Sequence, residues 1–168
     1  QYKEQLKPEG LPQAFTIGES FIGKDNVSLI LGDNFFYGQS LTKNLRKNMN
    51  FKKGARIFLH PVINSSFYGV ATINNKKQVI KLIEKPKKSK SNLAITGLYF
   101  FDNDVVKYTK KLKPSKRKEL EIVDLLNKYK SRKKLYAEFI GRGGAWLDTG
   151  SIEDFYKTSS FVSAIENR

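Results

Sequence analysis

The sequence contains no cysteine, a single histidine and no apolar run that approaches the length of a membrane span. Without cysteine, these residues can form neither a disulfide framework nor a thiolate zinc site. His60 has no second histidine or cysteine to join it, so we expect neither a catalytic triad nor a zinc centre and assign it no role. The polar opening segment, residues 1–7, does not have the pattern of a signal peptide, and we expect a cytoplasmic location.

Two common nucleotide-binding motifs are also missing. The sequence has neither Gly-x-x-x-x-Gly-Lys-Ser/Thr nor Gly-x-Gly-x-x-Gly, which excludes the P-loop and the dinucleotide fingerprint from these 168 residues. The first residue is Gln1 rather than methionine, so we expect a fragment or a processed chain.

Acidic residues are scarce beside basic ones. The chain has 16 Asp and Glu against 31 Lys and Arg, a formal net charge of +15. Such a charge is typical of nucleic-acid binders, or of a lineage with a compositional bias toward lysine. The basic residues are spread along the chain and are mostly lysine, and the densest cluster, residues 85–90, has no interleaved aromatics. We therefore favour the compositional bias and predict no nucleic-acid partner and no membrane partner.

Strand-like and helix-like segments alternate along the chain, which predicts the α/β class with a mainly parallel sheet. Residues 27–31 have the pattern of a buried parallel strand that ends in Gly32, Asp33 and Asn34. Asp102 and Ser151 stand where helix N-caps are expected. The other predicted strands are residues 55–62, 68–73, 79–84, 95–101 and 135–140, and the predicted helices are residues 11–21, 40–49, 104–111, 119–130 and 151–165.

Two aspartates follow predicted strands or glycine-rich segments. Asp33 lies at the carboxyl end of an apolar strand, where ligands of α/β sheets bind, and Asp148 lies among four glycines and the only tryptophan, Trp146. Carboxylates suit Mg²⁺, because hard cations prefer oxygen ligands, and two of them with a phosphate between suit nucleotidyl transfer. Each aspartate is equally consistent with a simple turn that bonds its own backbone.

A second group of candidates lies near the ends of other strands. Lys85 can reach a phosphate as a point charge, and Glu84 can accept bonds from sugar hydroxyls, although a surface ion pair would look the same. Tyr68 with Gly69, and Gly97 with Tyr99, each set an aromatic beside or near a glycine. Such pairs can line a sugar pocket, but ordinary strand packing is the alternative.

Six segments, taken together in their order along the chain, resemble the motifs of one protein family. They are PEGL at residues 8–11, LILGDNFFYG at 29–38, YGVATI at 68–73, IEKPKKSKSNLAITGLYFFDNDVV at 83–106, LKPSKRKELEIVDLLNKY at 112–129 and GRGGAWLDTG at 141–150. Together they resemble the sugar-nucleotide pyrophosphorylases, most of all the members that transfer a thymidylyl group. The resemblance covers essentially the whole chain.

The resemblance implies a Rossmann-like nucleotidyltransferase fold with a mixed, mainly parallel sheet. Residues 1–168 would be a single partial domain, the sugar-phosphate- and metal-binding part, without the N-terminal strand, loop and helix. It implies the reaction of dTTP with α-D-glucose 1-phosphate to give dTDP-glucose and diphosphate, with Mg²⁺ as cofactor. It also implies a product that feeds dTDP-rhamnose or another deoxysugar of cell-surface polysaccharide, and a homotetrameric full-length protein. A UTP-using uridylyltransferase is the alternative enzyme.

The same motifs imply a role for each matching residue. Lys85 and Arg117 would bind the sugar 1-phosphate and, with the Mg²⁺ ligands Asp33 and Asp148, would form the catalytic set. The remaining matches are Gln5 and Gly10 at the thymine edge, Tyr68, Gly69, Glu84, Ile95 and Tyr99 in the glucose pocket, Trp146 beside the reacting phosphates, and Tyr37 with Gly38 in a second nucleotide site for feedback control.

The sequence also departs from the family pattern. The glycine-rich Gly-Gly-x-Gly-Thr-Arg loop that cradles the triphosphate is absent from these residues, so we expect the 168-residue chain alone to be inactive. Lys118 and Val123 stand where glycine and threonine are usual. Two other classes remain open at this point: a catalytically inactive sugar-nucleotide-binding module and a basic nucleic-acid-binding domain.

Overall fold

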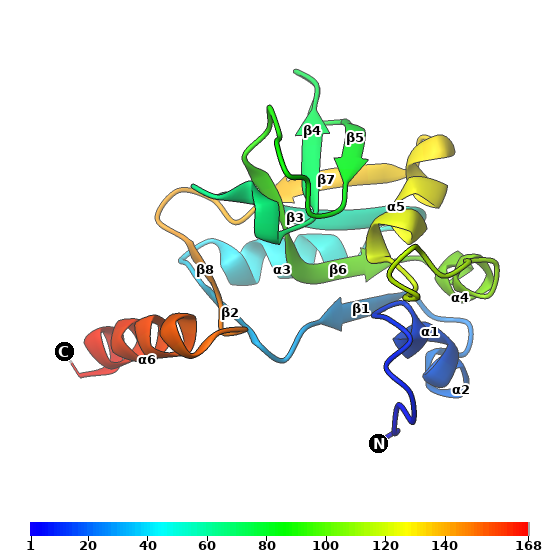
Figure 1. Ribbon diagram of the computed structural model, residues 1–168, viewed down its shortest axis with the longest axis horizontal. Helices are drawn as coiled ribbons and strands as arrows, with labels where there is room; N and C mark the ends of the chain where they lie inside the picture. Colours follow the sequence, from blue (N-terminus) through cyan, green and yellow to red (C-terminus); the bar gives the residue numbers. More distant parts are fainter. Residues whose placement is uncertain (168) are drawn as a thin grey trace.

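The computed structural model describes residues 1–167, which form a six-stranded sheet, a separate two-stranded ribbon and helices around them (Figure 1). The sheet order is β5-β4-β6-β3-β7, and β1 also pairs with β6. The strands are β1 (Val27–Ile30), β2 (Asn34–Tyr37), β3 (Ala55–Pro61), β4 (Val70–Ile73), β5 (Val79–Ile83), β6 (Leu93–Phe101), β7 (Leu135–Phe139) and β8 (Ala145–Asp148). The helices are α1 (Gln13–Ile17), α2 (Glu19–Ile22), α3 (Leu41–Met49), α4 (Asp104–Thr109), α5 (Ile122–Ser131) and α6 (Ile152–Glu166), with a 3₁₀ turn at Ser65–Phe67.

The α/β class with a mixed sheet is confirmed. Strands β1, β3 and β4 all run antiparallel to β6, and β7 runs parallel to β3, so these four strands share one direction. Strand β5 is antiparallel to β4 and therefore runs with β6. Among the described residues, β3 with β7 is the one neighbouring pair that is parallel, because β6 lies between the other strands of common direction.

The expectation that residues 27–31 form a buried parallel strand is wrong. Strand β1 is antiparallel to β6, and within residues 1–167 its other edge has no partner. Only alternate residues of β1 are partly buried, and Ile30 is 59% exposed. An apolar run indicates a strand, but it does not show which edges of the strand are paired or whether its neighbours are parallel.

Three other local predictions need correction. Residues 11–21 form two short helices, α1 and α2, that meet at Gly18, rather than one helix. The ribbon strands β2 and β8 were not expected, because their glycine-rich and polar flanks resemble loops. Asp102 does not cap α4: its carboxylate accepts hydrogen bonds from the Gly54 N–H at 2.6 Å and the Tyr129 hydroxyl at 2.8 Å. This buried carboxylate therefore ties together β6, the segment before β3, and α5.

Two hydrophobic clusters pack on the sheet. The larger one joins side chains of α1, α2, α4 and α5 to the strands, with Phe15, Phe101 and Tyr129 at its centre. The smaller one lies where α3 and the ribbon pack, and it includes Phe58 and Trp146. Helices α1, α2, α4 and α5 therefore cover the sheet in the larger cluster, and α3 with the ribbon covers it in the smaller one.

The ribbon of β2 and β8 leads directly into α6, which projects from the body of the molecule (Figure 1). The predicted cap of this helix is confirmed, since the Ser151 hydroxyl accepts the Asp154 N–H at 3.1 Å. In the part of the chain that the structure describes, we find no helix both long and apolar enough to cross a membrane.

Candidate functional site

Two aspartates lie side by side on the ribbon. Asn34 is the register partner of Asp148, so Asp33 is the diagonal neighbour of Asp148 across the ribbon. Thr149 donates hydrogen bonds from its N–H and its hydroxyl to the Asp33 carbonyl, at 2.8 and 2.9 Å. Burial raises the pKa of Asp148, and the Asp33 carboxylate raises it further, although the Gly150 N–H bond at 2.9 Å opposes this. Two like charges are thus held together, which is unfavourable unless a cation lies between them.

Asn34 connects the aspartate pair to the sheet. Its amide oxygen accepts the indole N–H of Trp146 at 2.6 Å and the backbone N–H of Gly97 at 3.0 Å. Its amide nitrogen donates to Asp33 Oδ1 at 2.8 Å. A side chain at Gly97 would collide with this amide, because an added Cβ would lie 2.6 Å from Asn34 Oδ1. Gly97 is therefore needed for close approach rather than for a turn.

Trp146 packs between two aromatic rings. Its ring centroid is 5.1 Å from that of Tyr68 and 6.1 Å from that of His60, both in edge-to-face arrangements. Burial raises the pKa of Tyr68, and the carboxylates of Asp148 and Asp154 raise it further. The Tyr68 hydroxyl therefore lies within electrostatic reach of the aspartate pair, so the aromatic wall and the carboxylates form one region.

Three side chains approach the backbone of Gly69 closely. A Cβ at this position would lie 3.2 Å from Val123 Cγ2, 3.3 Å from Glu84 Oε2 and 3.4 Å from Ile95 Cδ1. The Gly69 carbonyl accepts the Ile95 N–H at 2.8 Å, which holds the two backbones together. Gly69 therefore permits a close approach that brings the Glu84 carboxylate beside the apolar side chains of Val123 and Ile95, a mixture of groups that suits a sugar ring and its hydroxyls.

A group of charged side chains includes Glu84. Arg117 donates from Nε and Nη2 to the two oxygens of Glu121 at 3.0 and 2.7 Å, and its Nη2 lies 3.8 Å from Glu84 Oε1. Burial raises the pKa of Glu84 and the Glu121 carboxylate adds to this, whereas Arg117 and Lys85 lower it. The two cations thus partly offset the rise in the pKa of Glu84 that burial causes.

Lys85 interacts electrostatically with both groups of acids. Its N–H donates to the Tyr68 carbonyl at 3.1 Å, and its backbone has φ of +39°, an uncommon conformation for a residue other than glycine. Its charge lowers the pKa of Glu84, of Glu121 and of Asp148. The Lys85 ammonium group therefore acts electrostatically on both groups of acids, and the hydrogen bond to Tyr68 fixes the backbone from which its side chain extends.

Tyr99 is less accessible than a pocket-lining role would require. Its side chain belongs to the larger core cluster, is 3% exposed, and stacks on Phe101 at 6.1 Å between centroids. Burial raises its pKa far above the ordinary value, and the Glu84 carboxylate adds to this. Tyr99 thus packs in the core, within electrostatic reach of Glu84.

Gln5 and Gly10 lie on the N-terminal segment. The amide nitrogen of Gln5 donates to the Gly10 carbonyl at 3.4 Å, and Gln5 is exposed. Gly10 has φ of +110° and presses against the backbone of Leu120, whose N–H donates to the Glu9 carbonyl at 2.7 Å. The segment therefore touches the loop that carries Arg117, and within residues 1–167 Gln5 forms no hydrogen bond with either aspartate.

Tyr37 and Gly38 lie at the far end of β2 from the aspartates. Tyr37 is the register partner of Ala145, is 41% exposed and packs edge-to-face on Phe161 of α6 at 5.7 Å. Gly38 approaches Gly144, where an added Cβ would lie 3.0 Å from the neighbouring Cα. These two residues form a region of their own on the ribbon.

The fit of a metal ion can be judged from the donor set. Asp33 and Asp148 supply two carboxylates whose mutual repulsion a divalent cation would relieve. Within residues 1–167, no group of three or more Asp, Glu, His or Cys side chains could hold a metal ion. The pair therefore suits a cation that takes its remaining ligands from substrate phosphates and water, as Mg²⁺ does.

Two residues of this region were missed by sequence reasoning. Asn34 bonds to Asp33 and to Trp146, and Glu121 bonds to Arg117. The separation of Arg117 and Glu121 by four positions was a usable signal, whereas the link from Asn34 to Trp146 spans 112 residues and needs the ribbon.

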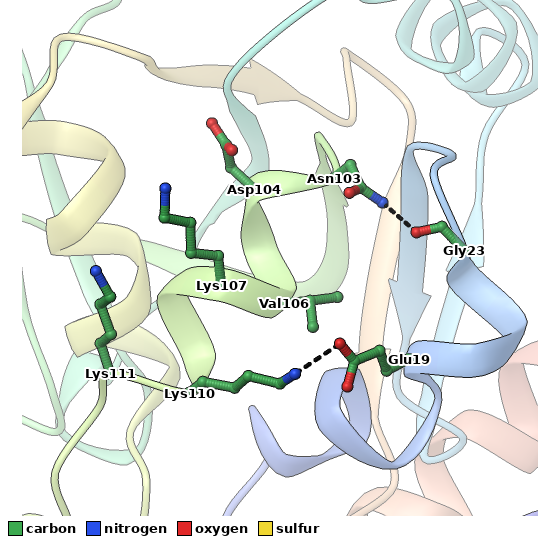
Figure 2. Close-up of a pocket in the computed structure, with 8 residues that line it drawn as sticks. All are labelled: Glu19, Gly23, Asn103, Asp104, Val106, Lys107, Lys110 and Lys111. Carbon is green, nitrogen blue, oxygen red and sulfur yellow. Dashed lines mark hydrogen bonds and ion pairs between the residues drawn. The ribbon is translucent and has the colours of Figure 1, made fainter.

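A surface cavity of about 410 Å³ lies elsewhere, between α2 and α4 (Figure 2). Lys110 pairs with Glu19 across it at 2.6 Å, and Asn103 donates to the Gly23 carbonyl at 2.9 Å. Lys107 and Lys111 point away from that pair (Figure 2). Because its polar groups bond to one another, we assign this cavity no role.

Comparisons with known proteins agree with the resemblance. The Nucleotidyl transferase family model matches residues 1–164. Glucose-1-phosphate thymidylyltransferase of Neisseria meningitidis serogroup A is 48% identical over 166 residues, and that of Xanthomonas campestris pv. campestris (strain B100) is 44% identical over 168 residues. These alignments cover 99% and 100% of this chain but only 58% and 57% of the relatives, so the chain spans little more than half their length.

Solved structures show the same likeness. A Bacillus anthracis protein in complex with a sucrose, provisionally described as a glucose-1-phosphate thymidylyltransferase, matches with a TM-score of 0.85 at 37% identity, over 96% of this chain and 64% of its own. A UDP-glucose pyrophosphorylase complexed with UDP-glucose also matches with a TM-score of 0.85, at 25% identity, over 99% of this chain and 66% of its own.

Proposed function

The chain belongs to the nucleotidyl transferase family, and we propose that it forms the sugar-phosphate- and metal-binding part of an enzyme that makes dTDP-glucose and diphosphate from dTTP and α-D-glucose 1-phosphate. One observation carries this proposal. Lys85 follows Glu84, which lies 3.8 Å from Arg117, and its N–H donates to the carbonyl of Tyr68, whose ring packs on Trp146 of the ribbon that carries the aspartates. A sugar phosphate bound there would have its ring beside Gly69 and Glu84 and its phosphate toward the aspartates.

In this proposal each side chain has a separate task. Gly69 has no side chain to keep the sugar ring away from the backbone, and Glu84 accepts hydrogen bonds from the sugar hydroxyls. Arg117 and Lys85 neutralise and orient the sugar phosphate, one through its planar guanidinium and the other as a point charge. Tyr68 and Trp146 exclude water from one side of the reacting groups.

The reaction itself needs little more than this positioning. An oxygen of the sugar phosphate attacks the α-phosphorus of dTTP, a new P–O bond forms, and the bond from the α-phosphorus to the bridging oxygen breaks as diphosphate leaves. Asp33 and Asp148 would hold a divalent cation, which supplies charge neutralisation to the phosphates when it is bound. No proton transfer is required, so the charged residues act by placing the reactants and balancing their charge.

The remaining parts of the proposal come from the family resemblance. They are Mg²⁺ as the cation, base contacts from Gln5 and Gly10, a feedback site at Tyr37 and Gly38, and a single partial domain over residues 1–168. They also include a cytoplasmic location, a homotetrameric full-length protein and a product that feeds dTDP-rhamnose or another deoxysugar of cell-surface polysaccharide.

A UTP-using enzyme is the second candidate, because a structure with bound UDP-glucose has a similarly high likeness. The higher identity of the thymidylyltransferases favours dTTP. The test is a diphosphate-release assay with glucose 1-phosphate and either nucleotide, on the longest gene product that contains these residues. We expect a higher kcat/KM for dTTP, and a loss of at least about 100-fold in Asp33→Ala and Asp148→Ala. Wild-type rates in both variants would sink the assignment of the cation site.

A further inference from the structure

The loop that precedes α5 holds the guanidinium of Arg117 with a carboxylate that has no other evident task. Glu121 accepts Arg117 Nε and Nη2 in a bidentate pair at 3.0 and 2.7 Å, and it also accepts the Ser115 hydroxyl at 2.7 Å. Glu121 occupies the N-cap position of α5, yet its side chain makes no capping hydrogen bond. The carboxylate is thus committed to Ser115 and Arg117 rather than to the helix.

The backbone of this loop is fixed as well. The Ser115 N–H donates to the Glu119 carbonyl at 2.8 Å, and the Lys118 N–H donates to the Ser115 carbonyl at 2.9 Å. The Arg117 N–H donates to the Ser115 hydroxyl oxygen at 3.0 Å, so the same hydroxyl bonds both to Arg117 and to Glu121. Arg117 is therefore held at its backbone and at its guanidinium.

The arrangement leaves one side of the guanidinium free. An arginine offers five N–H donors, and Glu121 uses those on Nε and Nη2. Within residues 1–167, no acceptor bonds to Nη1. The Arg117 side chain is 45% exposed, whereas that of Glu121 is 10% exposed, so the pair is anchored at its buried end and open at its outer end.

We infer that Glu121 is the positioning residue that holds the Arg117 guanidinium in place for the phosphate of a sugar 1-phosphate, an inference that rests on the function proposed above. A bidentate carboxylate sets the plane of the guanidinium, which a single contact does not. A guanidinium that is already held loses less side-chain freedom when a phosphate binds, so the phosphate is bound more tightly. Glu84, at 3.8 Å from Nη2, then faces the sugar rather than the phosphate.

The test compares Glu121→Gln with wild type in the 168-residue chain, by calorimetric titration with glucose 1-phosphate and, separately, with glucose. Glutamine has nearly the same shape but removes the charge and one acceptor. We expect affinity for glucose 1-phosphate to fall by about tenfold or more, with no change in affinity for glucose. Glu119→Gln is the matched control, since Glu119 is 48% exposed and lies 3.7 Å from Nη2, and we expect wild-type affinity.

A second measurement does not depend on any ligand. In ¹H–¹⁵N spectra, the Arg117 Nε–H of the wild type should exchange slowly with water, because it is bonded to Glu121, and this protection should be lost in Glu121→Gln. Unchanged protection, or unchanged affinity for glucose 1-phosphate, would overturn the inference. If wild type binds neither glucose 1-phosphate nor glucose, the proposed function fails, and the Nε–H signal alone then decides whether Glu121 holds the guanidinium.

Discussion

The indole Nε1 of Trp146 donates a hydrogen bond of 2.6 Å to the side-chain oxygen of Asn34. The same oxygen accepts the Gly97 N–H, and the other end of the amide donates to Asp33. One amide therefore joins the sheet, the ribbon and a candidate cation ligand. Because the ribbon is otherwise only two strands wide, this amide is a principal means of fixing the aspartates relative to β6.

Asn34→Ala should destabilise the protein by about 1–3 kcal/mol, because two buried N–H donors would lose their acceptor. Trp146 is the only tryptophan, so its fluorescence reports directly on this contact. We expect a red-shifted emission maximum and a lower urea midpoint. Asn92→Ala is the control, since Asn92 is exposed and its side chain makes no hydrogen bond within residues 1–167. Equal urea midpoints in the two variants would contradict the role of Asn34.

Asp33→Asn should weaken binding of a divalent cation by about tenfold or more, because one of two carboxylate ligands loses its charge. Mn²⁺, followed by electron paramagnetic resonance in the presence of glucose 1-phosphate, serves as the probe. Asp25→Asn is the matched control, because Asp25 is also exposed and lies outside the candidate site. The cation assignment fails if both variants bind Mn²⁺ as tightly as wild type.

Asp148→Asn should stabilise the fold at neutral pH. In the folded chain the pKa of Asp148 is raised above its ordinary value, through burial first and then the Asp33 carboxylate. Ionisation of Asp148 therefore costs stability as pH rises through this raised pKa. The gain in Asp148→Asn should be at most about 1 kcal/mol, because the site is partly exposed to solvent.

The pH dependence of the stability gain shows whether the gain comes from the Asp148 charge or from another effect of the substitution. The gain should be present at pH 7 and should vanish at a pH below the unfolded pKa, where both states carry a protonated carboxyl in wild type. Thermal melts of both proteins at a series of pH values measure it. A gain that is the same at every pH would show that the Asp148 charge is not its source.

Local sequence patterns predicted the elements that depend on short-range rules. The amphipathic helix over α5 and the Ser151 cap are confirmed, because both follow from residues within one or two turns. The pairing of β1 with β6 was not predictable, since Val27 meets Phe101 and nothing in either segment specifies direction.

The sequence predicted which residues belong to the candidate site but not how they contact one another in space. Motif order assigned Arg117 and Glu84 to one substrate, and the structure brings them within 3.8 Å. The partners that hold them could not be found in the same way. Asn34 bonds to Trp146, which lies 112 positions away in the sequence. The Glu121 side chain is only 10% exposed, whereas the sequence pattern around it indicates only that a helix begins there.

Lys118→Gly should stabilise the protein. Lys118 has φ of +62°, which is in the left-handed region. It is the last residue of the turn that its own N–H closes by bonding to the Ser115 carbonyl. A side chain in this region costs about 1–2 kcal/mol, which glycine avoids. Glycine also gains freedom in the unfolded chain, so the net gain should be smaller, about 0.5–1 kcal/mol. Differential scanning calorimetry should then show a Tm higher by about 1–4 °C.

Lys116→Gly provides the control for charge and for chain entropy, because it removes a neighbouring exposed lysine from the same loop without a positive φ. This variant should be neutral or slightly destabilised, since glycine adds freedom to the unfolded chain and relieves no strain. A matching gain in Lys116→Gly would mean that loss of positive charge, rather than backbone strain, is responsible. Because Lys118 adjoins Arg117, the stabilised variant should also keep the Arg117 Nε–H protected by Glu121.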